Sequence, residues 1–255
     1  MPDGVAGTTR VSALRVGGFV PFTTTDYPSA LAAVVFCQGC PWRCAYCHNP
    51  HLIPACVGER DRAEDPGLAG EANGGFARIL HWLATRRGLL DAVVFSGGEP
   101  TAQPQLAEAI AAVRERGFAI GLHTGGAYPR RLAEVLPLLD WVGLDIKAPM
   151  ADYASVTGVR GGGIAALASF DLIRDAGVAF EVRTTVHSAL LSPDALTHLA
   201  RELAAQGIER WVLQPFRPTG CADPHLVATA PRGVSVDPVL LTRLRGYVPA
   251  IEVRS

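Results

Sequence analysis

The sequence predicts an α/β protein built as an incomplete TIM-like (β/α)6 partial barrel with parallel strands. Six short, apolar, β-rich runs alternate with amphipathic helical stretches, as expected for strands that are buried on both faces. Repeated β-α units imply a parallel sheet with right-handed crossovers. A doubly wound open sheet shows the same alternation, and periodicity alone does not separate the two. The predicted strands cover residues 31–36, 92–95, 118–122, 141–146, 180–186 and 211–214.

The helices between these strands are predicted from apolar residues that recur on one helical face. Gly117, Gly177 and Gly207 stand where three of these helices should end, because glycine adopts the left-handed conformation that follows a helix. We expect a single domain over residues 1–255, with a core at about 28–215, an N-terminal extension at 1–27 and an irregular tail at 216–255. The apolar stripes are Phe76, Ile79, Leu80 and Leu83; Leu106, Ile110 and Val113; Leu167 and Ile173; and Leu196, Leu199 and Leu203.

Composition excludes several classes of protein. Hydrophobic residues make up 49% of the chain and charged residues 18%, so a large core is expected and wholesale disorder is not. The net charge of −1 gives no basic excess for binding nucleic acid or a membrane surface. Arg10 and Arg15 interrupt the N-terminal apolar residues, and no segment is long enough to span a bilayer. We therefore expect a cytoplasmic protein.

The most informative segment holds three thiols, Cys40, Cys44 and Cys47, within eight residues. Three clustered thiolates can bind three irons of a [4Fe–4S] cluster and leave the fourth iron open to a ligand. The competing reading is a zinc site that also uses Cys37, but zinc sites usually separate their two cysteine pairs by a dozen or more residues. We expect Cys37 to be a buried residue at a strand end, and Cys56 and Cys221 to be ordinary thiols.

Other polar residues follow the next predicted strands, where the carboxyl ends of a parallel sheet collect reactive groups. Gly97 and Gly98 allow a ligand to approach the backbone, and Glu99 beside them can pair with an ammonium group. Taken alone, this segment could be an ordinary turn. The His123-Thr124 pair ends the third strand, and a lone histidine there could be structural or could line a pocket.

The fourth and fifth strands carry charges. Asp145 and Lys147 share one face of an extended chain, so they could form an ion pair or meet a ligand together. Arg183 lies inside an apolar strand, where an unpaired charge is costly. It therefore needs an anionic partner, which we expect to be the ligand or a glutamate.

The cysteine spacing and the Gly97-Gly98-Glu99-Pro100 segment resemble the radical S-adenosylmethionine (SAM) superfamily. Asp26-Tyr27-Pro28, Cys47-His48-Asn49-Pro50 and Asp140-Trp-Val-Gly-Leu-Asp-Ile-Lys147 resemble one subgroup, the activating proteins of anaerobic ribonucleoside-triphosphate reductase. These are relatives of the pyruvate formate-lyase activating enzyme. The resemblance covers residues 12 to 220.

The resemblance implies both the cofactors and the reaction. Cys40, Cys44 and Cys47 would bind a [4Fe–4S] cluster, and SAM would chelate its open iron. Reduction by a flavodoxin-like or ferredoxin-like donor would cleave SAM and produce a 5′-deoxyadenosyl radical. That radical would take a hydrogen from a glycine of a partner glycyl-radical enzyme, which is expected to be anaerobic ribonucleotide reductase. The implied SAM-binding residues are Tyr46, Gly97, Gly98, Glu99, His123, Thr124, Asp145, Lys147 and Arg183.

The chain also departs from this family. Pyruvate formate-lyase activating enzymes carry an Asp-Thr pair that helps to bind a monovalent cation, and here the pair is His123-Thr124. Arg217 stands near the place where related activases have a histidine that faces the ribose of SAM. The alternatives are a small-molecule radical SAM enzyme, such as one similar to 7-carboxy-7-deazaguanine synthase, and a non-catalytic iron–sulfur or zinc protein.

Overall fold

A computed structural model describes residues 14–55, 75–230 and 236–254, which form one eight-stranded sheet. The strands are ordered β1 to β8 along the chain; β1 pairs antiparallel with β2, and all the later neighbours pair in parallel. Six of these strands, β2 to β7, match the six predicted ones. The strands are β1 (Val16–Thr23), β2 (Ala32–Cys37), β3 (Ala92–Gly97), β4 (Ala119–Thr124), β5 (Trp141–Asp145), β6 (Ala179–Val186), β7 (Arg210–Pro215) and β8 (Ala250–Val253).

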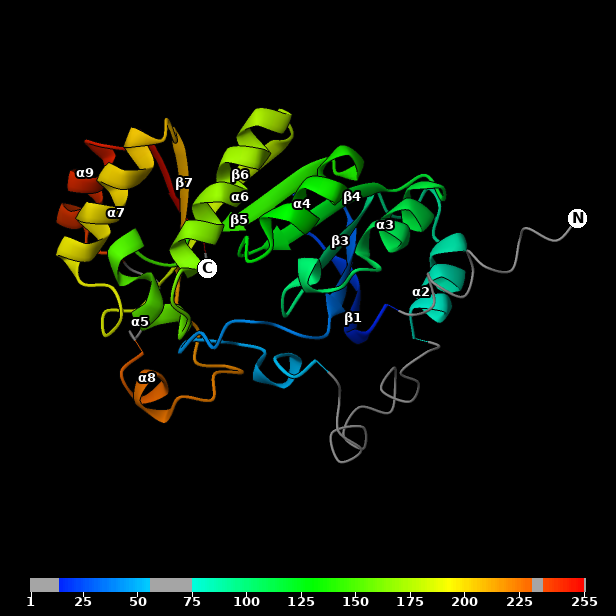
Figure 1. Ribbon diagram of the computed structural model, residues 1–255, viewed down its shortest axis with the longest axis horizontal. Coiled ribbons are helices and arrows are strands. Elements are labelled where there is room, and N and C mark those ends of the chain that lie inside the picture. Colours follow the sequence, from blue (N-terminus) through cyan, green and yellow to red (C-terminus); the bar gives the residue numbers. More distant parts are fainter. Residues whose placement is uncertain (1–13, 56–74, 231–235, 255) are drawn as a thin grey trace, which may run out of the picture.

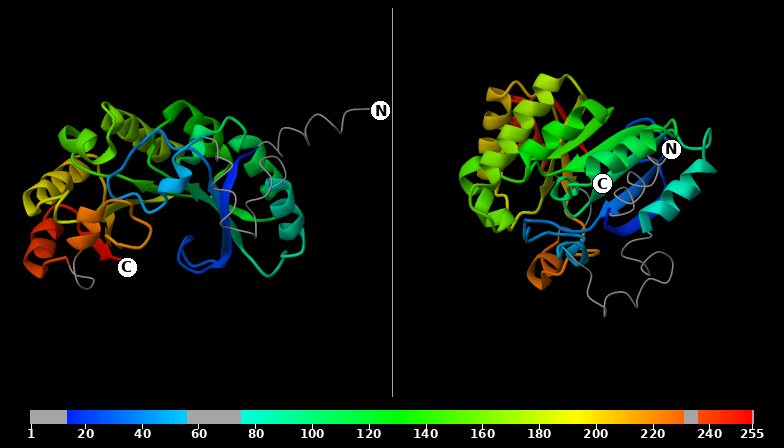
Figure 2. Two further views of the ribbon diagram at one scale, coloured as in Figure 1. Left: turned by 90° about the horizontal axis from the view of Figure 1, so that it is seen from below. Right: turned by 45° about the vertical axis from the view of Figure 1, so that its right-hand side comes forward.

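The sheet curves into an arch with the helices on its outer side (Figure 1), and the arch stays open between β1 and the C-terminal strand (Figure 2). The prediction of an incomplete, parallel-stranded barrel is confirmed. The α-helices are α2 (Gly75–Ala84), α3 (Leu106–Arg114), α4 (Pro129–Val135), α5 (Tyr153–Thr157), α6 (Gly162–Ala176), α7 (Pro193–Ala205), α8 (Pro224–Ala228) and α9 (Pro238–Arg245). Short 3-10 turns lie at η1 (Pro50–Leu52), η3 (Pro100–Ala102), η4 (Leu136–Leu138) and η5 (Met150–Asp152).

The strands alternate their side chains between two apolar layers. On β2, Ala33 and Val35 belong to the main core, whereas Ala32 and Val34 belong to a second, smaller cluster. Tyr27 packs against that smaller cluster. Both faces of the strand are therefore buried, which explains why it reads as a continuous apolar run.

The helices use the apolar stripes that the sequence predicts. All four residues of the α2 stripe are buried, and so are the three of the α3 stripe. Helix α6 ends at Gly177, whose φ of 68° lies in the left-handed region that a side chain would strain.

Two expectations about the ends of the chain need correction. The expected irregular tail at 216–255 contains α8, α9 and β8. Pro224 and Pro238 begin α8 and α9, where the carboxylates of Asp223 and Asp237 cap the backbone N–H groups that follow. The expected extension at 1–27 contributes β1 from Val16 onward, and its residues 1–13 lie outside the described part of the chain.

Within the described residues, no single helix has the length and apolar character needed to cross a membrane. Residues 150–157 and 162–176 reach that length only together, and they are bent by 115°.

Candidate active site

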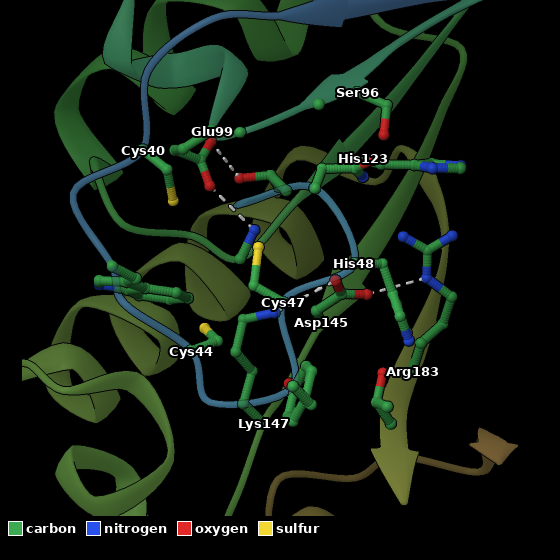
Figure 3. A pocket seen from close by; sticks show the side chains of 18 of the residues that line it. Cys40, Cys44, Cys47, His48, Ser96, Glu99, His123, Asp145, Lys147 and Arg183 are labelled. Carbon is green, nitrogen blue, oxygen red and sulfur yellow. Dashed lines mark hydrogen bonds and ion pairs between the residues drawn. The ribbon is translucent and has the colours of Figure 1, made fainter. Parts of the chain in front are cut away.

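The carboxyl ends of the parallel strands surround one cavity of about 260 Å³. The cysteine loop after β2 forms one wall, and the ends of β3 to β7 form the rest (Figure 3). Neighbouring parallel strands bring residues distant in sequence to the same edge of the sheet. Every predicted site residue lines this cavity: Cys40, Cys44, Tyr46, Cys47, Gly97, Gly98, Glu99, His123, Thr124, Asp145, Lys147 and Arg183.

Hydrogen bonds to three other segments hold the cysteine loop in place. The N–H of Cys40 donates to the carbonyl of Ile53 at 3.0 Å, and the N–H of Arg43 donates to Thr157 on α5 at 2.8 Å. On the far side, the ring Nε2 of His48 lies 2.9 Å from the carbonyl oxygen of Arg217. These hydrogen bonds attach the loop to the residue after η1, to α5 and to the segment after β7.

Three thiols share the cavity without meeting at one point. Burial raises the pKa of Cys40 to about 12, and it raises the pKa of Cys44 and Cys47 as well. Within the described residues, no three His, Cys, Asp or Glu side chains are grouped to hold a single metal ion. A [4Fe–4S] cluster fits this donor set, because each thiolate binds a different iron and the irons supply the positive charge that keeps buried thiols ionised.

The remaining cysteines lie apart from this group. Cys37 is fully buried at the end of β2 and is not among the residues that line the cavity. The Sγ of Cys221 lies 3.7 Å from the carbonyl oxygen of Ala45, so the segment after β7 touches the cysteine loop. Cys56 lies outside the described residues.

Glu99 is buried at the cavity wall and is held by its neighbours. Its Oε1 accepts hydrogen bonds from the hydroxyls of Thr101 at 2.6 Å and Thr124 at 2.7 Å, and its Oε2 accepts one from the N–H of Gly125 at 3.0 Å. Burial raises the pKa of Glu99, although these donors oppose that rise. The carboxylate is thus fixed in orientation, and Oε2, with a single protein donor, can accept another from a ligand.

Asp145 lies between two cations. Its Oδ1 accepts from Nε of Arg183 at 3.0 Å, and its Oδ2 lies 3.4 Å from Nζ of Lys147. Burial raises the pKa of Asp145, but the two cations outweigh burial and hold it below its usual value. The protein partner of Arg183 is therefore Asp145, which lies opposite it in the β5–β6 register, and not the glutamate considered from the sequence; a contact between Arg183 and a ligand stays a prediction.

His123 contributes a neutral ring. Its Nε2 lies 2.8 Å from the carbonyl oxygen of Asp26, and its ring meets Trp141 edge to face at 5.6 Å. Burial, reinforced by nearby Arg183, lowers the pKa of His123 to about 3. The imidazole therefore carries no charge near neutral pH.

The cavity also contains residues that were not predicted to belong to it. They include Asp26, Trp42, Ser96, Thr185 and Gln214. Trp42 lies between two predicted ligands, and Asp26 belongs to the quoted Asp-Tyr-Pro segment, so both carried a signal. Arg217, which was considered for the ribose, is exposed and does not line the cavity.

The comparisons with known proteins agree with this arrangement. The family model described as the radical SAM superfamily matches residues 34–191. A protein of Methanocaldococcus jannaschii, provisionally named a glycyl-radical enzyme activating enzyme, is 30% identical over 215 residues, which cover 82% of this chain and 82% of that protein.

Two further relatives match over shorter stretches. The pyruvate formate-lyase-activating enzyme of Clostridium pasteurianum is 33% identical over 50% of this chain and 51% of its own length. The 7-carboxy-7-deazaguanine synthase of Methanopyrus kandleri is 34% identical over 46% of this chain and 49% of its own length. Among solved structures, QueE from Escherichia coli shares the fold, with a TM-score of 0.56 and 14% identity over 99% of this chain and 100% of that one.

Proposed function

Because this chain belongs to the radical SAM superfamily and so is an enzyme that uses a [4Fe–4S] cluster and SAM, we propose that it is a glycyl-radical enzyme activase. We further propose that its partner is anaerobic ribonucleoside-triphosphate reductase. The observation that carries the activase proposal is the match to the M. jannaschii relative, which extends over four-fifths of both chains.

In this proposal the cysteine loop holds the cluster. Cys40, Cys44 and Cys47 would each bind one iron, and the amino and carboxylate groups of SAM would take the fourth. When bound and reduced, the cluster supplies the electron that cleaves SAM and yields the radical that takes a hydrogen from the partner's glycine. The protein contributes binding, orientation and the exclusion of water.

The strand ends would hold SAM itself. Glu99 would accept hydrogen bonds from its ammonium group, and Lys147 would meet its carboxylate, since charge-assisted hydrogen bonds are the strong ones. Gly97 and Gly98 would line the pocket with their backbone, and both must be glycine because a Cβ would collide with the backbone of Cys37 or Gly39. Tyr46 would offer ring surface to the adenine. Four more polar residues would complete the pocket: His123, Thr124, Asp145 and Arg183.

A second candidate function is a small-molecule reaction similar to that of 7-carboxy-7-deazaguanine synthase. It is favoured by the M. kandleri relative, which carries that name. The two candidates need different substrates: a peptide loop in one case and a small ligand held by fixed polar groups in the other.

The deciding experiment uses the protein with its cluster reconstituted, SAM, a reductant and the anaerobic ribonucleotide reductase from the same genome. We expect a glycyl-radical EPR doublet on the reductase. Changing the reductase's radical glycine to alanine should abolish the doublet. Ready cleavage of SAM without a radical on any glycyl-radical enzyme of that genome would contradict the activase proposal and favour the small-molecule candidate. A flavodoxin or ferredoxin from the genome should replace the chemical reductant.

A further inference from the structure

We infer that Trp42 is a positioning residue that holds the Lys147 ammonium in the SAM pocket and so couples the cysteine loop to SAM binding. Trp42 lies between Cys40 and Cys44 in sequence and lines the cavity, and its side chain contacts Gly125 after β4 and Tyr153 on α5. The inference depends on the proposed contact between Lys147 and SAM. It does not depend on which partner the enzyme activates.

The indole of Trp42 is buried and tightly packed. Only 4% of the residue is exposed, and its ring meets Tyr153 edge to face at 5.8 Å. A Cβ at Gly125 would overlap the indole ring, so glycine is the residue that lets Trp42 enter. Trp42 therefore joins the cysteine loop to the turn after β4 and to α5.

Lys147 lies against this indole. Its Nζ is 5.7 Å from the ring centroid of Trp42 and 5.6 Å from that of Tyr46. Its backbone N–H donates to the hydroxyl of Tyr153 at 3.3 Å. Cations are attracted to aromatic faces, most strongly to tryptophan, and the attraction grows when water is excluded. Lys147 is only 9% exposed, so water competes little here.

The nearby carboxylate cannot fix the ammonium alone. Asp145 contacts Arg183 at 3.0 Å and Lys147 at 3.4 Å, so the shorter contact belongs to the other cation. The two aromatic rings supply the remaining attraction. Removing the Trp42 ring should leave the Lys147 side chain more mobile. Binding of an anionic ligand group would then have to order that side chain, and the lost conformational entropy would lower the affinity.

The test measures SAM affinity of the cluster-loaded protein by the change that SAM causes in the EPR spectrum of the reduced cluster. Trp42→Leu should weaken SAM binding about five- to thirtyfold, the range that corresponds to a buried cation–π contact. Trp42→Phe should stay within about threefold of the wild type, because it keeps an aromatic face. Trp82→Leu is the matched control: Trp82 also has a cation, Arg86, over its ring and meets Phe19 edge to face, but it lies on α2 and does not line the cavity.

A double-mutant cycle separates positioning from a general loss of packing. In a Lys147→Ala background, Trp42→Leu should change SAM affinity by less than about twofold, because its effect acts through the missing ammonium. An equal loss in both backgrounds would overturn the inference, since Trp42 would then be only structural. Unchanged affinity in Lys147→Ala alone would also overturn it, by removing its premise.

A second variant covers the case in which Trp42→Leu fails to load the cluster. Gly125→Ala adds a methyl group that would overlap the indole and should displace it from its position beside Lys147. It should weaken SAM binding in the wild-type background and much less in Lys147→Ala. The smaller ring of a Trp42→Phe/Gly125→Ala double variant should recover part of the affinity. Full affinity in Gly125→Ala would contradict the proposed role.

Discussion

Asp145 shows how much of the pocket depends on single side chains. One carboxylate pairs with two cations, Lys147 after β5 and Arg183 on β6, so the three groups together keep one positive charge. Removing a partner from such a buried group leaves an uncompensated charge, which costs more than the pair contributes. The neighbouring imidazole of His123 stays neutral and adds no competing charge. The pocket therefore presents its cations to a ligand in fixed positions.

The division of labour among the cysteines gives a prediction at the same scale. Cys40→Ala, Cys44→Ala and Cys47→Ala should each lose the cluster, because each removes one of three ligands. Cys37→Ala should keep it, because Cys37 is buried in the core away from the cavity. Iron and sulfide analysis and the EPR spectrum of the reduced protein measure this. Loss of iron from Cys37→Ala would reverse the ligand assignment, provided that the variant is still folded by far-UV circular dichroism.

The sequence predicted the residues of the site better than their contacts. The cysteine spacing and the segment around Glu99 are short motifs of consecutive residues. Their positions directly after predicted strands were therefore enough to place Cys40 and Glu99 at strand ends. The partner of Arg183 is set by the register between β5 and β6, which no local pattern specifies. The contact between Trp42 and Gly125 joins two loops that are distant in sequence, so no local pattern specifies it either.

At the scale of elements, the sequence prediction missed two strands, β1 and β8, and the reason is plainest for β8. It has four residues, one of them Glu252, and it is followed by Arg254, so it lacks the apolar run that revealed the other parallel strands. Ion pairs, which no apolar pattern reveals, help to attach β8 to the neighbouring strands. Arg254 donates to both carboxylate oxygens of buried Glu181 at 2.7 and 3.1 Å and to Glu252 at 2.8 Å, while Arg210 donates to Glu252 at 3.0 Å. The network connects β6, β7 and the end of β8.

This network predicts an acid-dependent loss of stability. Hydrogen bonds from Arg254 lower the pKa of Glu252 to about 2, outweighing the opposing effect of burial. A carboxylate with a lowered pKa in the folded state stabilises the fold above its unfolded pKa of about 4.3, and the stabilisation is lost as pH falls toward 2. Glu252→Gln should therefore lower the free energy of unfolding near pH 7 and have less effect as pH falls.

The expected size of the effect is small, because the Glu252 side chain is 42% exposed and solvent screens its charge. We expect about 1 kcal/mol or less near pH 7. Urea unfolding at several pH values from 7 downward measures the difference between variant and wild type. Glu134→Gln, at an exposed position of α4, is the control and should show no such trend. A Glu252→Gln deficit that stays constant with pH would show that packing, rather than charge, accounts for it.

For the molecule as a whole, the open arch separates the support of the site from the site itself. The main core packs the outer helices against the strands, and the cavity lies at the carboxyl ends of those strands. The cysteine loop is attached to this frame through Ile53, Thr157 and the carbonyl of Arg217. None of these hydrogen bonds uses a thiol. The sheet, the helices and the hydrogen bonds that hold the loop should therefore persist when the metal is removed.

The last prediction follows from that separation. Anaerobic removal of iron with a chelator should leave the far-UV circular dichroism spectrum and cooperative unfolding unchanged, because the strands and helices supply most of the main core and the cysteine loop adds to it only Trp42 and Tyr46. Metal binding adds stability only by mass action on the folded state, so the melting temperature should fall without a change in mechanism. Faster amide exchange should be confined to the cysteine loop and to the segments that contact it, α5 and residues 216–221. Exchange that rises throughout β2 to β7 would instead mean that the cluster is part of the folding core, as in small zinc-dependent domains.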